Sequence, residues 1–253
     1  MLLGVLYAAL GAFTFALNNV AMRRGVVTGS VRQGMALTVP IGGLSFLVLT
    51  AAVGELRQLG AFPVEAIAWL AGQGVVHFVL GRYCNYKANQ RMGVNLTAPV
   101  VQLQVPVAML LAVATLHEKF TVLQAIGSVL MLGGSFVTQT KAGNRRNAAA
   151  PTTSAPVPLF QPRIVSGYIL ALGAAICYGA SPLMARQAFL SAPGAGSAAA
   201  GCLAYTAATL FFAPILLQPG AWRDIIGMRP ENLRWFLSSA VLVAMMRRLP
   251  SIL

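Results

Sequence analysis

The residues with the most evident chemical capability follow one face of an apolar stretch, Val64–Tyr83. Trp69, Gln73 and His77 recur there every four residues. Residues four apart lie on the same side of an α-helix, so this face would present an aromatic ring, an amide and an imidazole. Polar side chains inside membrane spans are costly and point to function. We predict that this face borders a cavity; the alternative is that His77 only hydrogen-bonds to a neighbouring helix.

Other polar side chains lie deep in apolar stretches on both sides of the chain's midpoint. Asn18 and Asn19 are adjacent and point about 100° apart on a helix, so one is expected to face a cavity and the other a neighbouring helix. Tyr178 and Ser181 lie three residues apart beside Pro182 and form the candidate pair of the second half. For each of these residues, plain packing is the alternative role.

A proline-containing stretch supplies one further candidate. Gln102 shares a helix face with Pro99 and Pro106, where a kink would free backbone carbonyl groups. We predict that Gln102 lines the same cavity. The predicted substrate-binding residues are Asn18, Asn19, Trp69, Gln73, His77, Gln102, Tyr178 and Ser181.

Catalysis and metal binding find little support in the sequence. An enzyme needs a convergent set of acid, base, nucleophile or metal ligands. The chain has only two histidines, which form no metal-ligand pair, and its acidic residues lie outside the middle of the apolar stretches. The three cysteines are scattered, which fits neither a disulfide framework nor a metal site. We therefore predict no catalytic residue, no metal and no cofactor, and regard a membrane-embedded enzyme as the weaker hypothesis.

Composition places the chain in a lipid bilayer. Of its 253 residues 57% are hydrophobic and 9% are charged, whereas soluble domains carry about a quarter charged residues. The net charge of +13 comes from cations that sit singly or in pairs between apolar runs. That pattern is typical of membrane-protein loops, and nucleic-acid binding is not expected. We predict a multi-pass protein of the cell inner membrane.

Run lengths predict an all-α integral membrane protein with eight spans, since about 20 apolar residues cross a bilayer as a helix. The predicted spans are Leu2–Met22, Gly34–Val53, Val64–Tyr83, Gly93–Leu116, Thr121–Thr140, Val165–Arg186, Ala198–Leu217 and Leu233–Met246. Thirteen Lys and Arg residues, Arg82 among them, fall in loops on one predicted side and five on the other. The positive-inside rule makes the richer side cytoplasmic.

The predicted hairpin Gly93–Thr140 carries a family resemblance. Pro106 lies in an apolar helix, a short hinge with Glu118 follows, and then comes VLQAIGSVLMLGGSFV. This order resembles the closing hairpin of an EamA-type repeat of the drug/metabolite transporter superfamily. The resemblance implies two five-helix repeats and export of small metabolites by alternating access. Small multidrug exporters of that superfamily use a carboxylate in their first helix, where this chain has Asn18 and Asn19.

Weak internal identities suggest a repeat on either side of a polar linker. The coinciding pairs are Gly11 with Gly173, Met22 with Met184, Arg24 with Arg186, Trp69 with Trp235 and Arg82 with Arg248. We therefore predict a first EamA-like repeat of five spans at residues 1–140, an Ala/Pro/Thr-rich linker at 141–162 and a partial second repeat of about three spans at 163–253. Substrate sites of repeat-built transporters lie between the halves.

The second half has no counterpart of the hairpin Gly93–Thr140, which predicts a truncated second repeat. An inactive transporter fragment is the alternative to a working carrier. We expect the hairpin to pack against the first and third spans. We also expect Tyr178, Ser181 and Ser239 to lie on an uncovered face, which a homodimer would bury. Gly127 and Gly134 share a helix face and offer a second dimer contact.

Overall fold

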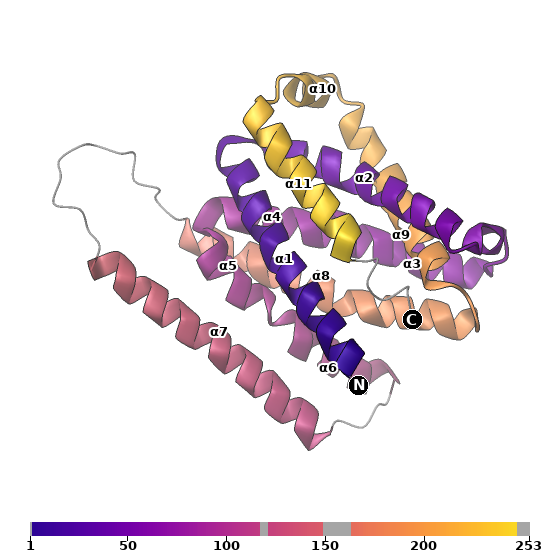
Figure 1. Ribbon diagram of the computed structural model, residues 1–253, viewed down its shortest axis with the longest axis horizontal. Coiled ribbons are helices and arrows are strands. Elements are labelled where there is room, and N and C mark those ends of the chain that lie inside the picture. The colour runs from indigo at the N-terminus through magenta and orange to yellow at the C-terminus, as the bar shows by residue number, and fades with distance from the viewer. Residues whose placement is uncertain (1, 117–120, 149–162, 247–253) are drawn as a thin grey trace.

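The computed structural model describes residues 2–116, 121–148 and 163–246, and the regular elements within these ranges are helices (Figure 1). In chain order they are α1 (Leu2–Thr28), α2 (Val31–Ala52), η1 (Glu55–Gly60), α3 (Val64–Gly74), η2 (Val75–Gly81), α4 (Arg82–Met92), α5 (Val94–Val101), α6 (Gln104–Leu116), α7 (Val122–Ala148), α8 (Ile164–Ser191), α9 (Ser197–Leu216), α10 (Pro219–Ile226) and α11 (Pro230–Met246). The predicted all-helical class is confirmed. The predicted hinge at Glu118 and most of the predicted linker lie outside the described residues.

Five helical stretches are long and apolar enough to cross a membrane, which makes this a multi-pass membrane protein. They are Val31–Ala52, Val64–Met92, Val94–Thr115, Ile164–Ser191 and Ser197–Leu216. They correspond to the second, third, fourth, sixth and seventh predicted spans. Helices α1, α7 and α11 cover the other three predicted positions, and α7 contains a shorter apolar part, Val122–Gly134.

The third span is longer than the sequence predicted. We expected it to end at Tyr83, with Arg82 among the loop cations, but α3, η2 and α4 continue without a break to Met92. That boundary was wrong because the charged segment after Gly81 still buries one helix face. Its buried members are Arg82, Asn85, Tyr86, Ala88, Asn89 and Met92. Helical spacing of polar and aromatic residues thus extends the span beyond its apolar part.

The fourth span breaks where its prolines predict a kink. Helix α5 ends at Val101 and α6 begins at Gln104. Pro106 has no N–H for the carbonyl of Gln102, four residues earlier. Instead the N–H of Val105 donates to the Gln102 oxygen at 3.2 Å, which tightens the chain locally. The break therefore follows directly from Pro106.

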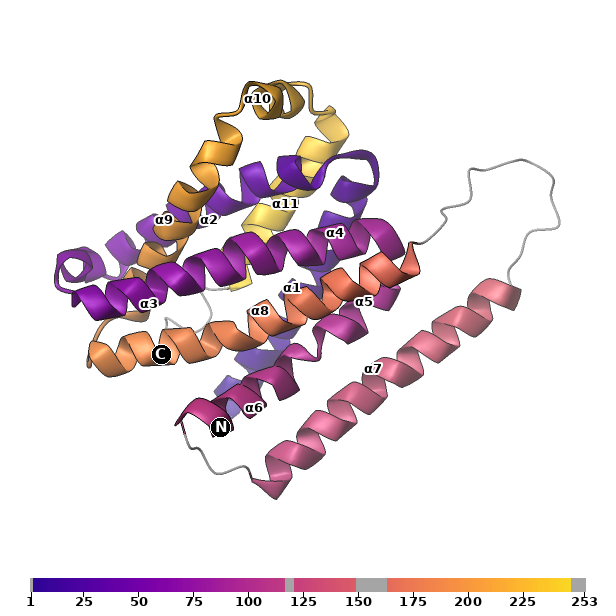
Figure 2. The ribbon, with the colours of Figure 1, turned by 180° about the vertical axis from the view of Figure 1, so that it is seen from behind.

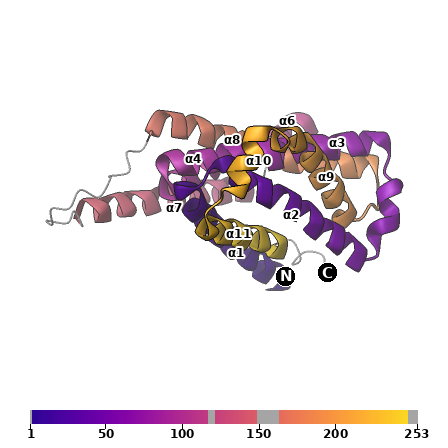
Figure 3. The same cartoon turned by 90° about the horizontal axis from the view of Figure 1, so that it is seen from above.

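The two halves of the chain interleave (Figures 1 and 2). Helix α11 packs along α1, α9 packs on α2 and α3, and α8 packs on α3, α4 and α6. Seen from above, α1 and α11 form one edge of the bundle (Figure 3). Glycines permit the closest approaches: a Cβ on Gly74 would lie 2.0 Å from the Ala204 carbonyl oxygen, and one on Gly42 2.4 Å from the ring of Tyr205.

The hairpin packs only in part as expected. Helix α6 lies against α8, the predicted sixth span, and α7 lies beside α5 at the margin of the bundle (Figures 1 and 2). A Cβ on Gly127 or Gly134 would meet nothing within 4 Å in the described structure. The expectation that the hairpin packs against the first and third spans holds for α5, which contacts α1 and α4, and is wrong for α6, which lies against α8.

The expected uncovered face is also absent from the described structure. Ser181 and Ser239 are buried, and the ring of Tyr178 packs against Gly81. Helices of the first half cover these side chains, because α8, α9 and α11 of the second half each pack against helices of the first half. The argument for a homodimer from that face is wrong, and dimerisation stays a prediction.

Candidate functional site

Four of the predicted site residues converge between α3–η2 and α8. The Gln73 Nε2 donates to Ser181 Oγ at 3.4 Å, which joins the first half of the chain to the second. One helical turn further on, the rings of His77 and Tyr178 lie 4.7 Å apart between centroids. Two helices from different halves thus present an amide, an imidazole, a phenol and a hydroxyl to one another.

A cavity of about 200 Å³ opens beside this convergence. Its walls are Phe46, Leu70, Gln73, His77, Phe78, Ser181, Ala185, Phe189, Ser197, Ala200, Gly201 and Ala204. The polar groups of this set are one amide, one imidazole and two hydroxyls, and none is Asp, Glu, Lys or Arg. Among the described residues, no three His, Cys, Asp or Glu side chains gather into a possible metal site. The cavity therefore suits a ligand held by uncharged hydrogen-bonding groups.

Trp69 does not join this cavity, contrary to the sequence prediction. Its side chain is 38% exposed on the outside of the bundle, whereas Leu70 is buried and lines the cavity. A four-residue step advances about 400° around a helix, so the face drifts by about 40° at each repeat. Over two repeats that drift carries Trp69 away from the wall that His77 occupies.

The remaining candidates lie elsewhere. Asn18 is buried and accepts a hydrogen bond from Ser239 Oγ at 2.5 Å, which ties α1 to α11. Asn19 is half-buried on the same helix. Gln102 stands at the break between α5 and α6 and is half-buried. The structure does not bring these three residues to the cavity that Gln73 and His77 line.

A buried cation, Arg82, lies beside the cavity, although it was predicted to be one of the loop cations. Arg82 is only 5% exposed, and its Nη2 donates to the Tyr205 hydroxyl at 3.0 Å. Tyr205 stacks on Phe78 with 3.8 Å between ring centroids. The signal was present in the sequence, because Arg82, Asn85 and Asn89 recur at helical spacing after Gly81. The predicted span ends at Tyr83 and leaves Asn85 and Asn89 in a loop.

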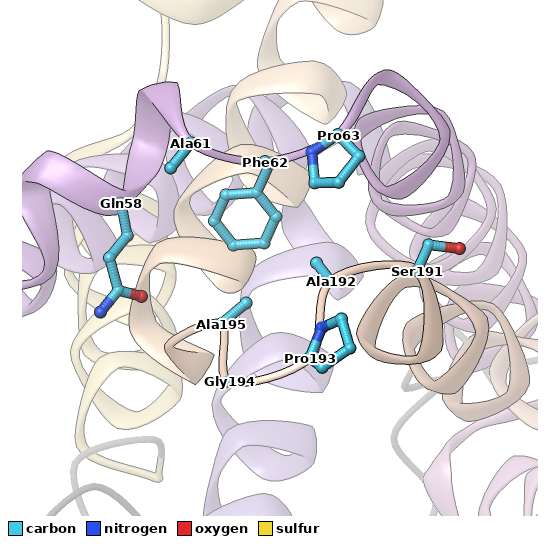
Figure 4. Close-up of a pocket in the computed structure, with 9 residues that line it drawn as sticks. All are labelled: Gln58, Ala61, Phe62, Pro63, Ser191, Ala192, Pro193, Gly194 and Ala195. Carbon is cyan, nitrogen blue, oxygen red and sulfur yellow. The ribbon is translucent and has the colours of Figure 1, made fainter.

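A second, wider cavity of about 450 Å³ lies between two turns, the one that precedes α3 and the one that joins α8 to α9 (Figure 4). Its lining residues are Gln58, Ala61, Phe62, Pro63, Ser191, Ala192, Pro193, Gly194 and Ala195. Gln58 Oε1 accepts the Gly196 N–H at 2.6 Å, and Glu55 Oε2 accepts the Ala199 N–H at 2.9 Å. Side chains of η1 therefore cap the first turn of α9 from the other half of the chain.

Comparison with known proteins agrees with this architecture. A comparison with curated proteins gives no match. Residues 2–140, more than half of the chain, match the EamA-like transporter family. The matched segment contains α1 to α6 and most of α7, and therefore Gln73, His77 and Arg82. The chain thus belongs to the EamA-like transporter family.

Proposed function

We propose that the chain carries a small metabolite across the cell inner membrane, in the direction of export, and binds it at the cavity between Gln73, His77 and Ser181. The observation that carries this proposal is the Gln73–Ser181 contact, where polar groups from both halves meet beside an open volume. Carriers built from two repeats bind their substrates between the repeats. A relative movement of α3 and α8 would then open the cavity to one side at a time.

The chemistry of the walls limits what can bind. Ligand pockets usually measure about 300–1,000 Å³, so a cavity of about 200 Å³ suits a small solute. Gln73, Ser181 and Ser197 offer both donors and acceptors, and Phe46 and Phe189 supply apolar walls. The ring of Tyr178 packs against that of His77, with 4.7 Å between the ring centroids. A compact polar metabolite fits these groups better than a large lipophilic drug.

Ligand-dependent stability offers the direct test. The purified full chain in detergent is heated with single solutes from a set of small neutral, zwitterionic and anionic metabolites, because a ligand that binds the native state raises Tm. A solute that raises Tm is then assayed for transport in proteoliposomes. We expect Gln73→Ala and Ser181→Ala to lose about 1–2 kcal/mol of binding free energy, roughly five- to thirtyfold in Kd, through lost hydrogen bonds.

The matched control is Trp69→Ala on the same helix, which removes a large side chain from the outside of the bundle. It should leave binding unchanged. Equal losses in Trp69→Ala and Gln73→Ala, or none in either, would contradict the site. A wild-type chain that binds and transports no solute would favour the alternative, an inactive transporter fragment.

A further inference from the structure

A guanidinium group is buried within a membrane-spanning helix. Arg82 lies in the 29-residue stretch Val64–Met92, roughly 15 Å from its C-terminal end at 1.5 Å per residue. Its side chain is 5% exposed. A guanidinium keeps its charge in proteins, so the structure holds a permanent positive charge inside the bundle. Such charges are rare in membranes and mark ligand or ion pathways.

The contacts that the structure gives Arg82 are neutral. Nη2 donates to the Tyr205 hydroxyl at 3.0 Å, and the guanidinium carbon lies 5.4 Å from the ring centroid of Phe78 and 5.8 Å from that of Tyr205. The ionisable side chains that interact electrostatically with it are three tyrosines: Tyr205, Tyr86 and Tyr178. Aromatic faces attract a cation but do not neutralise it.

One half of the guanidinium has no hydrogen-bond partner among the described residues. Arg82 Nη1 is buried and makes no hydrogen bond there. The acidic side chains that the structure describes are engaged or located elsewhere: Glu55 caps α9, while Glu65 and Glu231 are exposed in the first turns of α3 and α11. A buried donor on a buried charge is costly unless an anion meets it.

The guanidinium and the cavity share a wall. Phe78 lines the cavity, lies under the guanidinium and stacks on Tyr205. Tyr205 is fully buried, and the absence of a side chain at Gly42 makes room for its ring. Phe78 therefore borders both the cavity and the guanidinium, and contact between a bound solute and Arg82 requires the Phe78 side chain to rotate.

From the unpartnered Nη1 and this shared wall, we infer that the solute proposed above carries an anionic oxygen group, a carboxylate or phosphate, which pairs with Arg82; the inference depends on that proposed function. Gln73, His77 and Ser181 then bind the uncharged part of the solute. Tyr205 is a positioning residue, because its hydroxyl fixes Nη2 and leaves Nη1 for the anion. Arginine suits this task, since its planar fork matches carboxylate and phosphate oxygens.

The test compares anions with neutral solutes of the same shape. The full chain in detergent is heated with acetate, lactate and succinate, with acetamide, lactamide and succinamide, and with inorganic phosphate. We expect at least one anion to raise Tm while its amide does not. Arg82→Gln keeps polar donors but loses the charge. It should raise the Kd for that anion roughly tenfold or more, as expected for the loss of a charge-assisted hydrogen bond. Arg82→Lys should retain part of the preference for the anion over its amide.

Several outcomes would overturn the inference. They are equal stabilisation by an anion and its amide in the wild type, no effect of any anion, or an unchanged Kd in Arg82→Gln. The wild-type comparison decides the matter even if the Arg82 variants do not fold. Native mass spectrometry provides a separate arm for a lipid source: phosphatidylglycerol retained by the wild type and lost in Arg82→Gln would assign the charge to a lipid phosphate instead. If Gln73→Ala abolishes binding of a neutral solute while Arg82→Gln changes nothing, the proposed cavity stands and only the anion inference fails.

Discussion

Two long helices of this chain differ in how they meet their surroundings. The helix Val64–Met92 buries Arg82, Asn85 and Asn89 and contacts helices of both halves. The helix α7 exposes apolar side chains, among them Leu130, and lies mainly beside α5. Lipid tails are as apolar as leucine, so exposed apolar side chains drive no association in a membrane. Polar groups and close backbone approaches decide which helices form the centre of the bundle.

The comparison predicts that truncation of a buried ring damages the fold far more than truncation on α7. Phe236 of α11 is fully buried, and its ring packs against Gly25 of α1 and Gly34 of α2. We expect Phe236→Ala to lower the free energy of unfolding by about 3–5 kcal/mol, as for other buried aromatic residues. Leu130→Ala, at a side chain that is 69% exposed, should change little. Thermal unfolding in detergent measures both, and similar losses in the two variants would remove the distinction between the centre of the bundle and α7.

The glycines of the two helices sharpen the same contrast. Gly74→Ala would place a Cβ 2.0 Å from the Ala204 backbone oxygen and force α3 away from α9. We expect a loss of about 1–3 kcal/mol from this overpacking. Gly134→Ala meets nothing within 4 Å and should stabilise α7 slightly, because alanine favours helix. The two variants are compared by Tm and by the monodisperse fraction in size-exclusion chromatography. A loss of stability in Gly134→Ala as large as in Gly74→Ala would show that α7 packs more closely against its neighbours than in this structure.

The smallest expected effect is at the cap that joins the halves outside the helix bundle. Glu55→Ala removes the acceptor for the Ala199 N–H, and capping groups contribute about 0.5–2 kcal/mol. Glu65→Ala, which changes an exposed carboxylate in the first turn of α3, is the matched control. Hydrogen exchange of the first turn of α9 should rise in Glu55→Ala alone. Unchanged protection there would mean that Gln58 suffices as the cap.

The sequence was sufficient for the fold class and selected some of the residues that line the candidate cavity. Run lengths predicted membrane-spanning helices, and Pro106 predicted the break that separates α5 from α6. Gln73 and Ser181 were selected separately, as polar residues within spans, and the structure joins them at 3.4 Å. Polarity within an apolar run is thus a signal that a single sequence can provide, because it reflects the cost of burial in lipid.

The rest could not follow from local patterns. Trp69 was assigned to the wrong side because a four-residue repeat drifts around the helix. Arg82 was counted among the loop cations because the segment that follows it is polar, whereas its contact with Tyr205 spans 123 positions of the chain. The packing of α8 against α6, a helix of the other half, depends on the tertiary arrangement of the halves. Local periodicity in the sequence does not indicate which helices far apart in the chain will contact each other.

The central claim is that the cavity between the halves binds the transported solute, and protection of a cysteine at Ser181 tests it most directly. Ser181→Cys is introduced after Cys84, Cys177 and Cys202 are replaced by serine or alanine, and a small methanethiosulfonate reagent is applied with and without the solute that raises Tm. We predict that the solute slows modification of Ser181→Cys and leaves that of Glu65→Cys, at an exposed position in the first turn of α3, unchanged. Equal modification rates of Ser181→Cys with and without the solute would contradict the claim.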